Sequence, residues 1–287
     1  MAILRKICIL KDALIGYLIK WKIDLRGAKL SFDSDLCEIP VVVSLTSYGR
    51  RVSSVVYYAL VSILNQTVKP QRIILWLDDT WSKKTLPKKL LSLERFGVEY
   101  KFCRDLKSYK KLLPTLNEIS EYPIVTVDDD VMYEPNFLKS LYDSYLAEPD
   151  KIHCTHAVSP ILKSENQFES YIKWPEYIKN DSHTDYIFPI GEGGVLYPPK
   201  SLYKDVTDFD LALSLCPNAD DIWFWIMALK NGTKHKVVDL KKVFYSFDAL
   251  YQFLHKGSAL THSNAKKNKN DEQLKQVVSY YKMKFKY

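Results

Sequence analysis

Strand and helix patterns alternate from residue 39 to residue 130, and this alternation constrains the fold more than any other feature. The strand patterns are short runs rich in β-branched and aromatic residues, at 39–48, 72–79, 98–104 and 122–130. Between them, apolar residues recur at helical spacing over 53–66, 86–97 and, in part, 107–119. Short strand–helix–strand connections form right-handed units, so we predict an α/β fold: a Rossmann-like, mixed and mainly parallel sheet flanked by helices.

The strict alternation stops after residue 135, but no linker or internal repeat marks a second domain. Helical spacing recurs at 135–149, 219–232 and 271–285, and strand patterns recur at 151–158 and 234–240. An irregular stretch covers 159–190, and a loop of that length in a compact domain is often functional. We therefore predict a single domain between two basic ends, with boundaries at 1–39, 40–262 and 263–287.

The positive charge of the chain is concentrated at its ends. The formal net charge is +7, yet residues 1–30 hold seven Lys or Arg against two Asp, and residues 262–287 hold seven Lys against two acids. The body between them is slightly acidic, whereas a nucleic-acid-binding protein more often has a basic patch on its folded surface. Basic ends suit either peripheral contact with an anionic membrane or solubility alone.

The five scattered cysteines form no CxxC pair, which favours a reducing, cytoplasmic setting.

The N-terminal segment ILRKICILKDALIGYLIKW is the candidate for membrane contact. Lys11 and Asp12 interrupt it, so it lacks the roughly 20 apolar residues that span a bilayer. Its apolar residues recur at helical spacing, at Ile7, Leu10, Leu14, Tyr17 and Leu18. We expect an amphipathic helix that lies either on the inner face of the cell membrane or on its own domain.

Three consecutive aspartates, Asp128 to Asp130, close the fourth strand pattern in IVTVDDDVMYEP. One interpretation is that they cap a helix that starts near Asn136. A single capping residue, however, already stabilises a helix by about 1 kcal/mol, so three are not needed for capping. The other is that a divalent cation offsets their mutual repulsion, since Mg²⁺ or Mn²⁺ binds carboxylates and substrate phosphates. Strand alternation predicts Asp128 and Asp130 on one side and Asp129 on the other.

Polar residues also follow the other predicted strands, in SLTSYGR after the first and LDDTW after the second. Ligands of doubly wound sheets bind at the carboxyl ends of the strands, so we expect a site at this edge. The sequence contains no GxGxxG and no GxxxxGK[ST], so neither a dinucleotide fold nor a P-loop is supported.

A strand that ends in D-x-D after several βα units resembles the GT-A fold of nucleotide-sugar-dependent glycosyltransferases. The segment VVVSLTSYGRRVSSVVYYALVSILNQTVKPQRIILWL also resembles the opening of bacterial family-two-like members, and the likeness covers roughly residues 40–240. It implies a nucleotide-binding half at 40–135 and an acceptor half at 136–262. It also implies a metal-dependent transfer of sugar from a nucleotide-diphosphate sugar, and a UDP-sugar is the first choice of donor.

The resemblance assigns roles residue by residue. The first-strand loop would hold the nucleotide, an acid of the second strand would contact the base, and a basic residue would lie nearby. Asp128 would face ribose and metal, Asp129 would be a neighbouring partner, and Asp130 would be the direct metal ligand. The remaining nucleotide-sugar candidates are Thr46, Ser47, Tyr48, Arg50, Asp78 or Asp79, and Lys110 with Lys111. For both lysines a solvated helix face is the alternative.

A second group of candidates lies in GEGGVLYPP and ADDIWFW. Glycines at 191, 193 and 194 allow close approach of backbone to a ligand, so we expect Gly193 and Gly194 to contact the sugar donor and Glu192 the acceptor. The resemblance implies that Asp221 is the general base of an inverting displacement, with Asp220 as the alternative or as an acceptor contact. Trp223 and Trp225 are candidates for stacking on a sugar, although at least one is expected in the core.

The resemblance also implies a late histidine at the metal, for which His262 is preferred over His255. The expected acceptor is a glycan or lipid-linked oligosaccharide of a bacterial surface polysaccharide.

Three alternatives to a glycosyltransferase stay open. A haloacid-dehalogenase-type phosphohydrolase places its D-x-D motif on the first strand, and a nucleotidyltransferase carries a Gly-rich loop there, of which SLTSYGRR is a poor version. A non-catalytic carbohydrate-binding protein would not need acidic pairs at both places.

Overall fold

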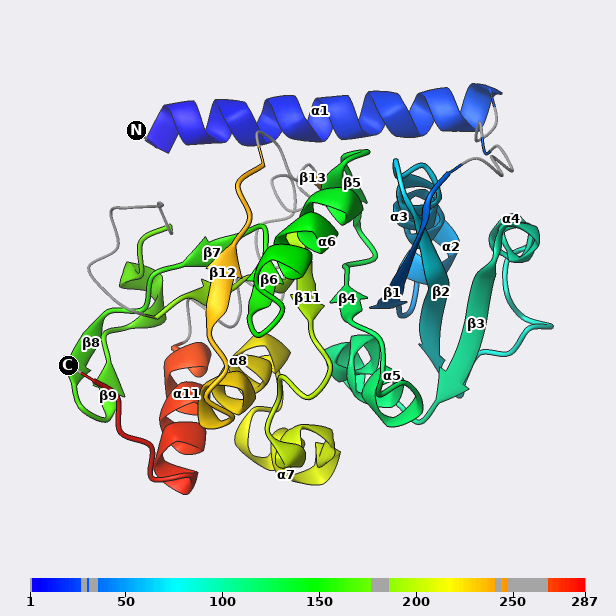
Figure 1. The fold of residues 1–287 in the computed structure, drawn as a ribbon. Coiled ribbons are helices and arrows are strands. Elements are labelled where there is room, and N and C mark those ends of the chain that lie inside the picture. Colours follow the sequence, from blue (N-terminus) through cyan, green and yellow to red (C-terminus); the bar gives the residue numbers. More distant parts are fainter. Residues whose placement is uncertain are drawn as a thin grey trace.

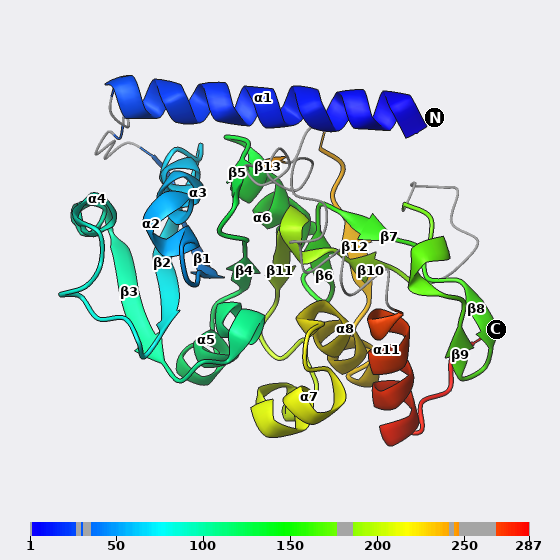
Figure 2. The ribbon, with the colours of Figure 1, turned by 180° about the vertical axis from the view of Figure 1, so that it is seen from behind.

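The computed structural model describes residues 2–26, 30, 36–176, 186–240, 244–246 and 268–286. Its first half contains the following elements: α1 (Ala2–Arg26), β1 (Glu38–Thr46), α2 (Arg51–Ser54), α3 (Val56–Leu64), β2 (Lys69–Asp78), α4 (Lys88–Leu91), η1 (Glu94–Phe96), β3 (Val98–Cys103), η2 (Lys107–Lys111), α5 (Leu113–Glu118), β4 (Ile124–Thr126), β5 (Val131–Tyr133) and α6 (Phe137–Ala147). Figures 1 and 2 show the arrangement from opposite sides.

The second half contains short strands and helices: β6 (Ile152–Cys154), β7 (Ala157–Val158), β8 (Leu162–Ser164), β9 (Gln167–Phe168), η3 (Tyr171–Lys173), β10 (Phe188–Pro189), η4 (Gly191–Gly193), β11 (Val195–Tyr197), η5 (Lys204–Thr207), α7 (Phe209–Leu215), α8 (Asp220–Lys230), β12 (His235–Val237), β13 (Phe244–Ser246) and α11 (Lys269–Tyr280).

A seven-stranded sheet in the order β12-β6-β11-β4-β1-β2-β3 forms the centre of the molecule. β1 pairs in parallel with β2 and β4, β2 with β3, and β6 with β12. β11 is the antiparallel strand, between β4 and β6. The predicted α/β class and mixed, mainly parallel sheet are therefore confirmed. The division of the chain into segments at residues 40 and 262 stays a prediction.

Side-chain alternation along the strands divides most of the core into two large clusters. In β4, Val125 packs with β1, β2, α3 and α6, whereas Ile124 packs with α7, α8 and α11. In β11, Leu196 joins the first cluster and Val195 the second. Successive strand residues point to opposite faces of a sheet, so each face carries its own layer of helices. This double cover explains why the strand patterns are apolar without polar alternation.

Several predicted elements differ from the structure in length or continuity; the strand expected at 151–158, for example, is divided into β6 and β7. The helix expected at 86–97 is the single turn α4 followed by η1, and the segment ends at Gly97, where φ is +91°. The helix expected at 107–119 is split into η2 and α5, since Pro114 occupies the first turn of α5 and cannot lie inside a longer helix. The strand expected at 122–130 ends at Thr126, so the three aspartates lie beyond it.

Helix α1 runs along one edge of the molecule, above β5, α6 and α3 (Figures 1 and 2). Its partly buried residues Ile19 and Ile23 pack against Tyr58 of α3 and Met132 of β5. The helix expected near the N-terminus is therefore present, but it packs on its own domain through Ile19 and Ile23, whereas Leu14, Tyr17 and Leu18 of the predicted apolar stripe are exposed. Among the described helices none is long and apolar enough to cross a membrane.

Candidate functional site

Three loops meet at one edge of the sheet. Ser44 of β1 pairs with Thr126 of β4, and Thr126 pairs with Val195 of β11. Because β1 and β4 are parallel and β11 is antiparallel to β4, the residues after β1, after β4 and before β11 emerge together. The first predicted site and the glycine-rich loop are thereby brought to the same place, although about 65 residues separate them in the sequence.

Arg51, at the start of α2, binds two of the three aspartates. Its Nη1 lies 2.8 Å from Asp129 Oδ1, and its Nη2 lies 2.8 Å from Asp130 Oδ2. Asp129 also accepts a 2.5 Å hydrogen bond from Ser47 Oγ. The expectation that Asp129 points away from Asp130 is wrong, because the aspartates follow the strand in a turn where strand alternation does not apply.

Asp128 pairs instead with Lys111, which lies at the centre of a second group of acids. The Lys111 Nζ is 3.2 Å from Asp128 Oδ1, 3.1 Å from Asp220 Oδ2 and 3.8 Å from Asp221 Oδ1. Burial alone would lower the pKa of Lys111, but these three carboxylates outweigh burial and hold the pKa well above its ordinary value. Lys111 therefore stays charged and joins the two acidic stretches of the sequence.

Asp221 has the perturbed acidity expected of a proton acceptor at neutral pH. Burial raises its pKa to about 7, the Lys111 ammonium opposes that rise, and the charges of Asp220 and Asp128 add to it. Its Oδ2 accepts a 3.1 Å hydrogen bond from the Gly191 amide. A Cβ at residue 191 would lie 2.7 Å from Asp221 Oδ1 and 2.8 Å from Lys111 Nζ, so glycine permits this contact.

Glu192 adds a further carboxyl group between the two groups of acids. Burial raises its pKa to about 7, with a contribution from Asp128 and an opposing one from Arg51. Burial likewise raises the pKa of Asp130, although Arg51 opposes it. The Tyr133 hydroxyl accepts from the Asp128 amide at 2.9 Å and donates to the Glu192 carbonyl at 3.0 Å, which fixes the two loops to each other.

The remaining nucleotide-binding candidates surround this cluster at different depths. Thr46 Oγ1 donates to the Trp76 carbonyl at 2.9 Å. Tyr48 is 51% exposed, and the Arg51 guanidinium lies 5.4 Å from the centre of its ring. Arg50 and Asp79 are exposed.

Asp78 and Lys110 are both buried, but their side chains bind neighbours near the end of β2 and in η2. Asp78 Oδ1 accepts from the amide and the hydroxyl of Thr80. Lys110 Nζ binds Asp105, outside the group that Lys111 joins. Of the two adjacent lysines, Lys111 is therefore the one that reaches the acids.

The second group of candidates is only partly brought to the site. Asp220 Oδ1 accepts a 2.8 Å hydrogen bond from Ser108, beside Lys111. Packing accounts for both later glycines: a Cβ at residue 193 would lie 2.5 Å from the His156 Cβ, and one at residue 194 would lie 2.4 Å from the Phe137 ring. Their contact with a donor stays a prediction.

Trp223 requires a correction. It is 0% exposed and its Nε1 donates to the Val206 carbonyl at 3.0 Å, so it is a core residue with no face available to an acceptor. Trp225 is 1% exposed and lies in the same core. Helix α8 buries nearly its whole circumference, which is why both indoles are enclosed. His255 and His262 lie outside the described residues.

Arg51 and Tyr133 are the site residues that sequence reasoning missed. The doublet Arg50-Arg51 carries a signal for a basic residue in the first-strand loop, but only the phase of α2 decides which of the two faces the aspartates. Tyr133 follows the aspartates by three residues in a run that is otherwise apolar, and nothing in the pattern distinguishes it from a core tyrosine.

The donor chemistry of the cluster suits a hard divalent cation. Asp128 and Asp130 supply carboxylate oxygens, and Mg²⁺ is usually bound through one or two carboxylates together with substrate phosphates and water. Across the described ranges no three Asp, Glu, His or Cys side chains form a ready-made metal group. A cation here would therefore rely on oxygens of a phosphate-bearing ligand to complete its coordination.

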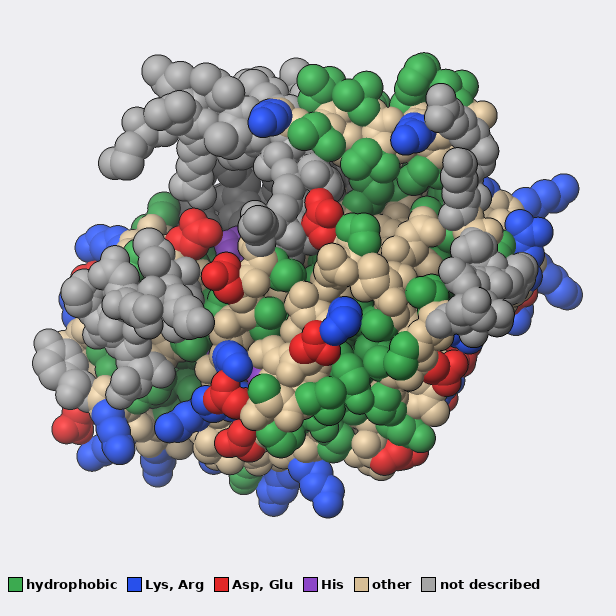
Figure 3. Space-filling model, turned by 45° about the horizontal axis from the view of Figure 1, so that its top comes forward, with side chains coloured by type: hydrophobic (Ala, Val, Ile, Leu, Met, Phe, Trp, Pro, Cys, Tyr) green, Lys and Arg blue, Asp and Glu red, His purple; other side chains and the backbone are tan. Residues whose placement is uncertain are grey.

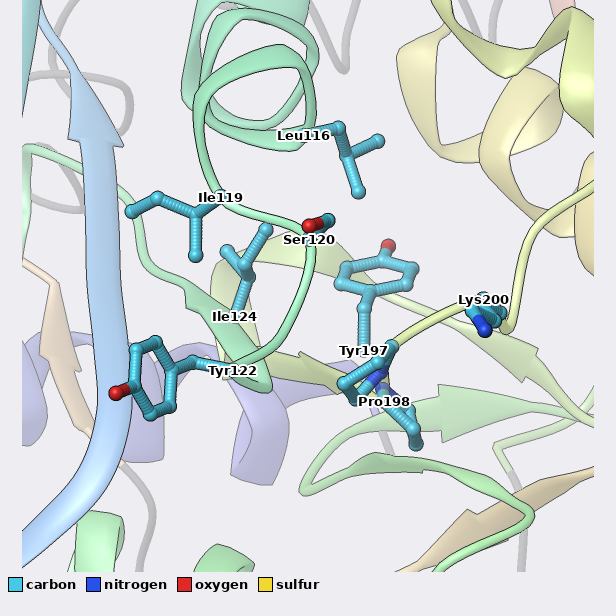
Figure 4. Close-up of a pocket in the computed structure, with 9 residues that line it drawn as sticks. Leu116, Ile119, Ser120, Tyr122, Ile124, Tyr197, Pro198 and Lys200 are labelled. Carbon is cyan, nitrogen blue, oxygen red and sulfur yellow. The ribbon is translucent and has the colours of Figure 1, made fainter.

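A small cavity of about 130 Å³ lies away from this cluster (Figure 4). Its lining includes Ile124, the first residue of β4, and Tyr197, the last residue of β11, which pair with each other. The cavity is thus at the opposite end of β4 from the aspartates. Leu116 and Ile119 make much of the remaining wall apolar, and the cavity is not part of the acidic site.

No family model and no curated protein matches this sequence. Solved structures can be superposed on it in part. Residues 1–349 of S. aureus TarS in complex with UDP are 13% identical with a TM-score of 0.49, over 75% of this chain and 63% of that one. Inositol-1-phosphate CTP transferase from T. maritima is 16% identical with a TM-score of 0.46, over 83% and 98%. UTP-bound UGPase from Acinetobacter baumannii is 12% identical with a TM-score of 0.45, over 85% and 99%. At these values the superpositions assign no activity to this chain.

Proposed function

We propose that this chain is a metal-dependent glycosyltransferase with a GT-A-type fold, which moves a sugar from a nucleotide-diphosphate sugar to a hydroxyl group of a glycan. The observation that most supports this proposal is the position of Lys111 between Asp128 and the Asp220–Asp221 pair. Asp128, one of the acids expected to hold the donor diphosphate, and Asp221, the acid expected to activate the acceptor, therefore lie 3.2 Å and 3.8 Å from one ammonium group.

In this proposal Asp221 accepts the proton of the acceptor hydroxyl. A pKa of about 7 matches that task, because the carboxylate is substantially ionised at neutral pH and still basic enough to take up a proton. The Gly191 amide orients one carboxylate oxygen. Lys111 keeps part of the Asp221 population ionised, and Asp220 in turn positions Lys111 through its 3.1 Å contact.

The donor side is proposed to use Asp128 and Asp130 as carboxylate ligands of Mn²⁺ or Mg²⁺. The bound cation would neutralise charge that develops on the departing nucleotide diphosphate. Arg51 occupies Asp129 and Asp130 in this structure, and it compensates the charge of those acids. Ser47 holds Asp129 in place, so the aspartate turn is positioned by both β1 and α2. A UDP-sugar is the donor class to test first, and a glycan on a lipid-linked carrier is the proposed acceptor.

The test is a thermal-shift and hydrolysis screen of UDP-, GDP-, CDP- and CMP-sugars with and without Mn²⁺. Wild type is compared with Asp130→Ala and with Asp143→Ala, a control on the exposed side of α6 whose side chain is 56% exposed. We expect a Mn²⁺-dependent rise in Tm with one donor in wild type and in the control, and none in Asp130→Ala. The ligand-induced rise is compared within each variant, because loss of a buried carboxyl also changes the Tm of the free protein.

Three outcomes contradict the proposal. The first is the absence of a metal-dependent response to every nucleotide sugar. The second is release of pyrophosphate from a nucleoside triphosphate and a sugar phosphate, which indicates a nucleotidyltransferase. The third is glycan binding without any nucleotide response, which indicates a carbohydrate-binding protein.

A further inference from the structure

The inner face of α1 is held to the domain by apolar packing and by one acidic side chain, that of Asp24. Asp24 accepts hydrogen bonds from the Tyr58 hydroxyl and from Lys89 Nζ, the latter at 2.6 Å, and it also pairs with Lys20 at 2.9 Å. These three donors outweigh the effect of burial and hold the pKa of Asp24 well below its ordinary value. The helix is therefore held to α3 and α4 at its C-terminal end, and its opposite face is fixed outward.

That outward face is apolar. Five large side chains project from it with between 52% and 64% of their surface exposed: Leu14, Tyr17, Leu18, Trp21 and Leu25. Their spacing of three or four residues places them on one stripe. They make up half of the ten large apolar side chains that are exposed in the described part of the chain. Figure 3 shows hydrophobic side chains gathered along this edge of the molecule, with basic side chains beside them.

We propose that this outer face of α1 docks on an anionic phospholipid surface. Leucine together with Trp and Tyr is the composition of helices that lie in a membrane interface, where aromatic rings sit at headgroup level. Lys11 and Lys22 are exposed next to the stripe. Residues 1–30 hold seven basic side chains against two acids, and phosphate headgroups complement that excess. Helix α1 is not apolar enough to cross a membrane.

The same charge disfavours a second copy of the chain as the occupant. Pairing two identical stripes would bring two strongly basic segments together, and like charges across an interface oppose association. Docking on an anionic lipid surface instead brings opposite charges together, which favours association. The packing of Met132 and Tyr58 on α1 also fixes the helix to β5 and α3, which flank Asp130 and Arg51. The acidic site would thus hold a constant orientation to the membrane, whatever reaction it performs.

The test is flotation of the full chain with vesicles of phosphatidylcholine alone and of phosphatidylcholine mixed with phosphatidylglycerol. The double variant Leu18→Gln/Trp21→Gln is compared with Leu146→Gln/Ile172→Gln, a control at two equally exposed apolar positions, 59% and 66%, elsewhere on the surface. We expect wild type and control to float with the anionic vesicles. The α1 variant should bind them at least about tenfold more weakly, because burial of two large apolar side chains is lost.

A spectroscopic arm keeps the test independent of the stability of the double variant. Brominated phospholipid should quench tryptophan fluorescence in wild type and much less in Trp21→Phe, which still floats. Equal flotation of the α1 variant and wild type, no binding to either vesicle, or unchanged quenching in Trp21→Phe would overturn the proposal. A dimer that the α1 variant converts to a monomer would identify a second copy as the occupant and would overturn it as well. Nucleotide-sugar responses do not enter any arm, so the outcome is separate from that of the proposed reaction.

Discussion

At the scale of single residues, the acidity of the site is set by two cations placed among its carboxyl groups. Arg51 compensates Asp129 and Asp130, and Lys111 lies between Asp128 and the start of α8. Within the described residues no such cation contacts Glu192 directly, and burial raises the pKa of Glu192 to about 7. Carboxyl groups that titrate near neutrality are typical of acid–base and ligand-binding sites, whereas a carboxyl group that serves only in a structural ion pair stays ionised.

Replacement of Asp221 by Asn tests the proposed base. Asparagine keeps the shape of the side chain and can still accept from the Gly191 amide, but it cannot take up a proton. We expect donor binding to survive and sugar transfer to fall by roughly 10²- to 10⁴-fold. In wild type, transfer should rise as the pH increases through about 7, because only the ionised form of Asp221 accepts a proton.

The measurements are the rate of transfer over a pH series and the donor affinity at one pH. Asp220→Asn serves as the comparison, since Asp220 contacts Lys111 and Ser108 and has no hydrogen bond to the glycine loop. Transfer by Asp221→Asn at the wild-type rate would place the base at another residue.

The two neighbouring arginines offer a matched pair for stability. Arg51→Gln leaves Asp129 and Asp130 without their cation, and removal of one partner of a buried ion pair costs about 3–5 kcal/mol. Arg51 keeps 27% of its side chain exposed, so we expect a loss of up to about 3 kcal/mol. Arg50→Gln, at an exposed position, should stay within about 0.5 kcal/mol of wild type. Urea unfolding of both variants measures this, and equal losses would contradict the assigned contacts.

At the scale of elements, Gly191 in η4 and Gly194 directly after it have different roles. An Ala at residue 191 would place its Cβ against Asp221 and Lys111, whose flexible ends can shift, so we expect transfer to fall more than stability. An Ala at residue 194 would meet the Phe137 ring at a backbone φ of +86°, so we expect about 1–3 kcal/mol of destabilisation. Transfer rates and chemical unfolding of both variants separate the two effects. Wild-type transfer in Gly191→Ala would show that the contact with Asp221 is not needed.

Six of the seven strands of the central sheet were predictable, because they read as short apolar runs; the seventh, β11, is three residues long and was not predicted. The helices between them were less predictable, since Pro114 breaks a pattern that looks continuous when only apolar spacing is considered. The length of the fourth strand was overestimated for a related reason. Val127 is buried and its amide still donates to the Ser44 carbonyl of β1 at 3.1 Å, but regular pairing ends there and the chain turns through the aspartates. Apolar periodicity reports burial, and it reports hydrogen-bonded pairing only indirectly.

At the scale of the whole molecule, the site depends on contacts between segments that no local pattern relates. The acidic character of residues 128–130 and 220–221 was visible in the sequence, but their meeting around Lys111 depends on the sheet order, in which β11 lies next to β4. The choice between Lys110 and Lys111 depends on which of these two buried, adjacent side chains in η2 reaches Asp128 and the start of α8. Trp223 shows the converse, because an aromatic residue next to candidate acids is fully enclosed by α8 packing.

The cluster also leaves a signature in the pH dependence of global stability. Burial raises the pKa values of Glu192 and Asp221 to about 7, from ordinary values of 4.5 and 3.8. The folded protein therefore holds protons that the unfolded chain has released, and these two groups lower the free energy of unfolding as the pH rises through that range. The buried imidazoles of His153, His156 and His235 act in the opposite direction, since burial lowers their pKa values.

The double variant Glu192→Gln/Asp221→Asn isolates the carboxyl contribution, because the histidines are common to both proteins. Neutral amides do not titrate, so the variant should gain stability over wild type steadily from about pH 4.5 to pH 7, with little further gain once both acids are ionised in wild type. Urea unfolding over this pH range, without divalent cations, measures the difference. A difference that is constant with pH would mean that neither acid titrates with a raised pKa in the folded protein. A bound cation or nucleotide sugar would favour the ionised acids, so its addition should reduce the difference at pH 7.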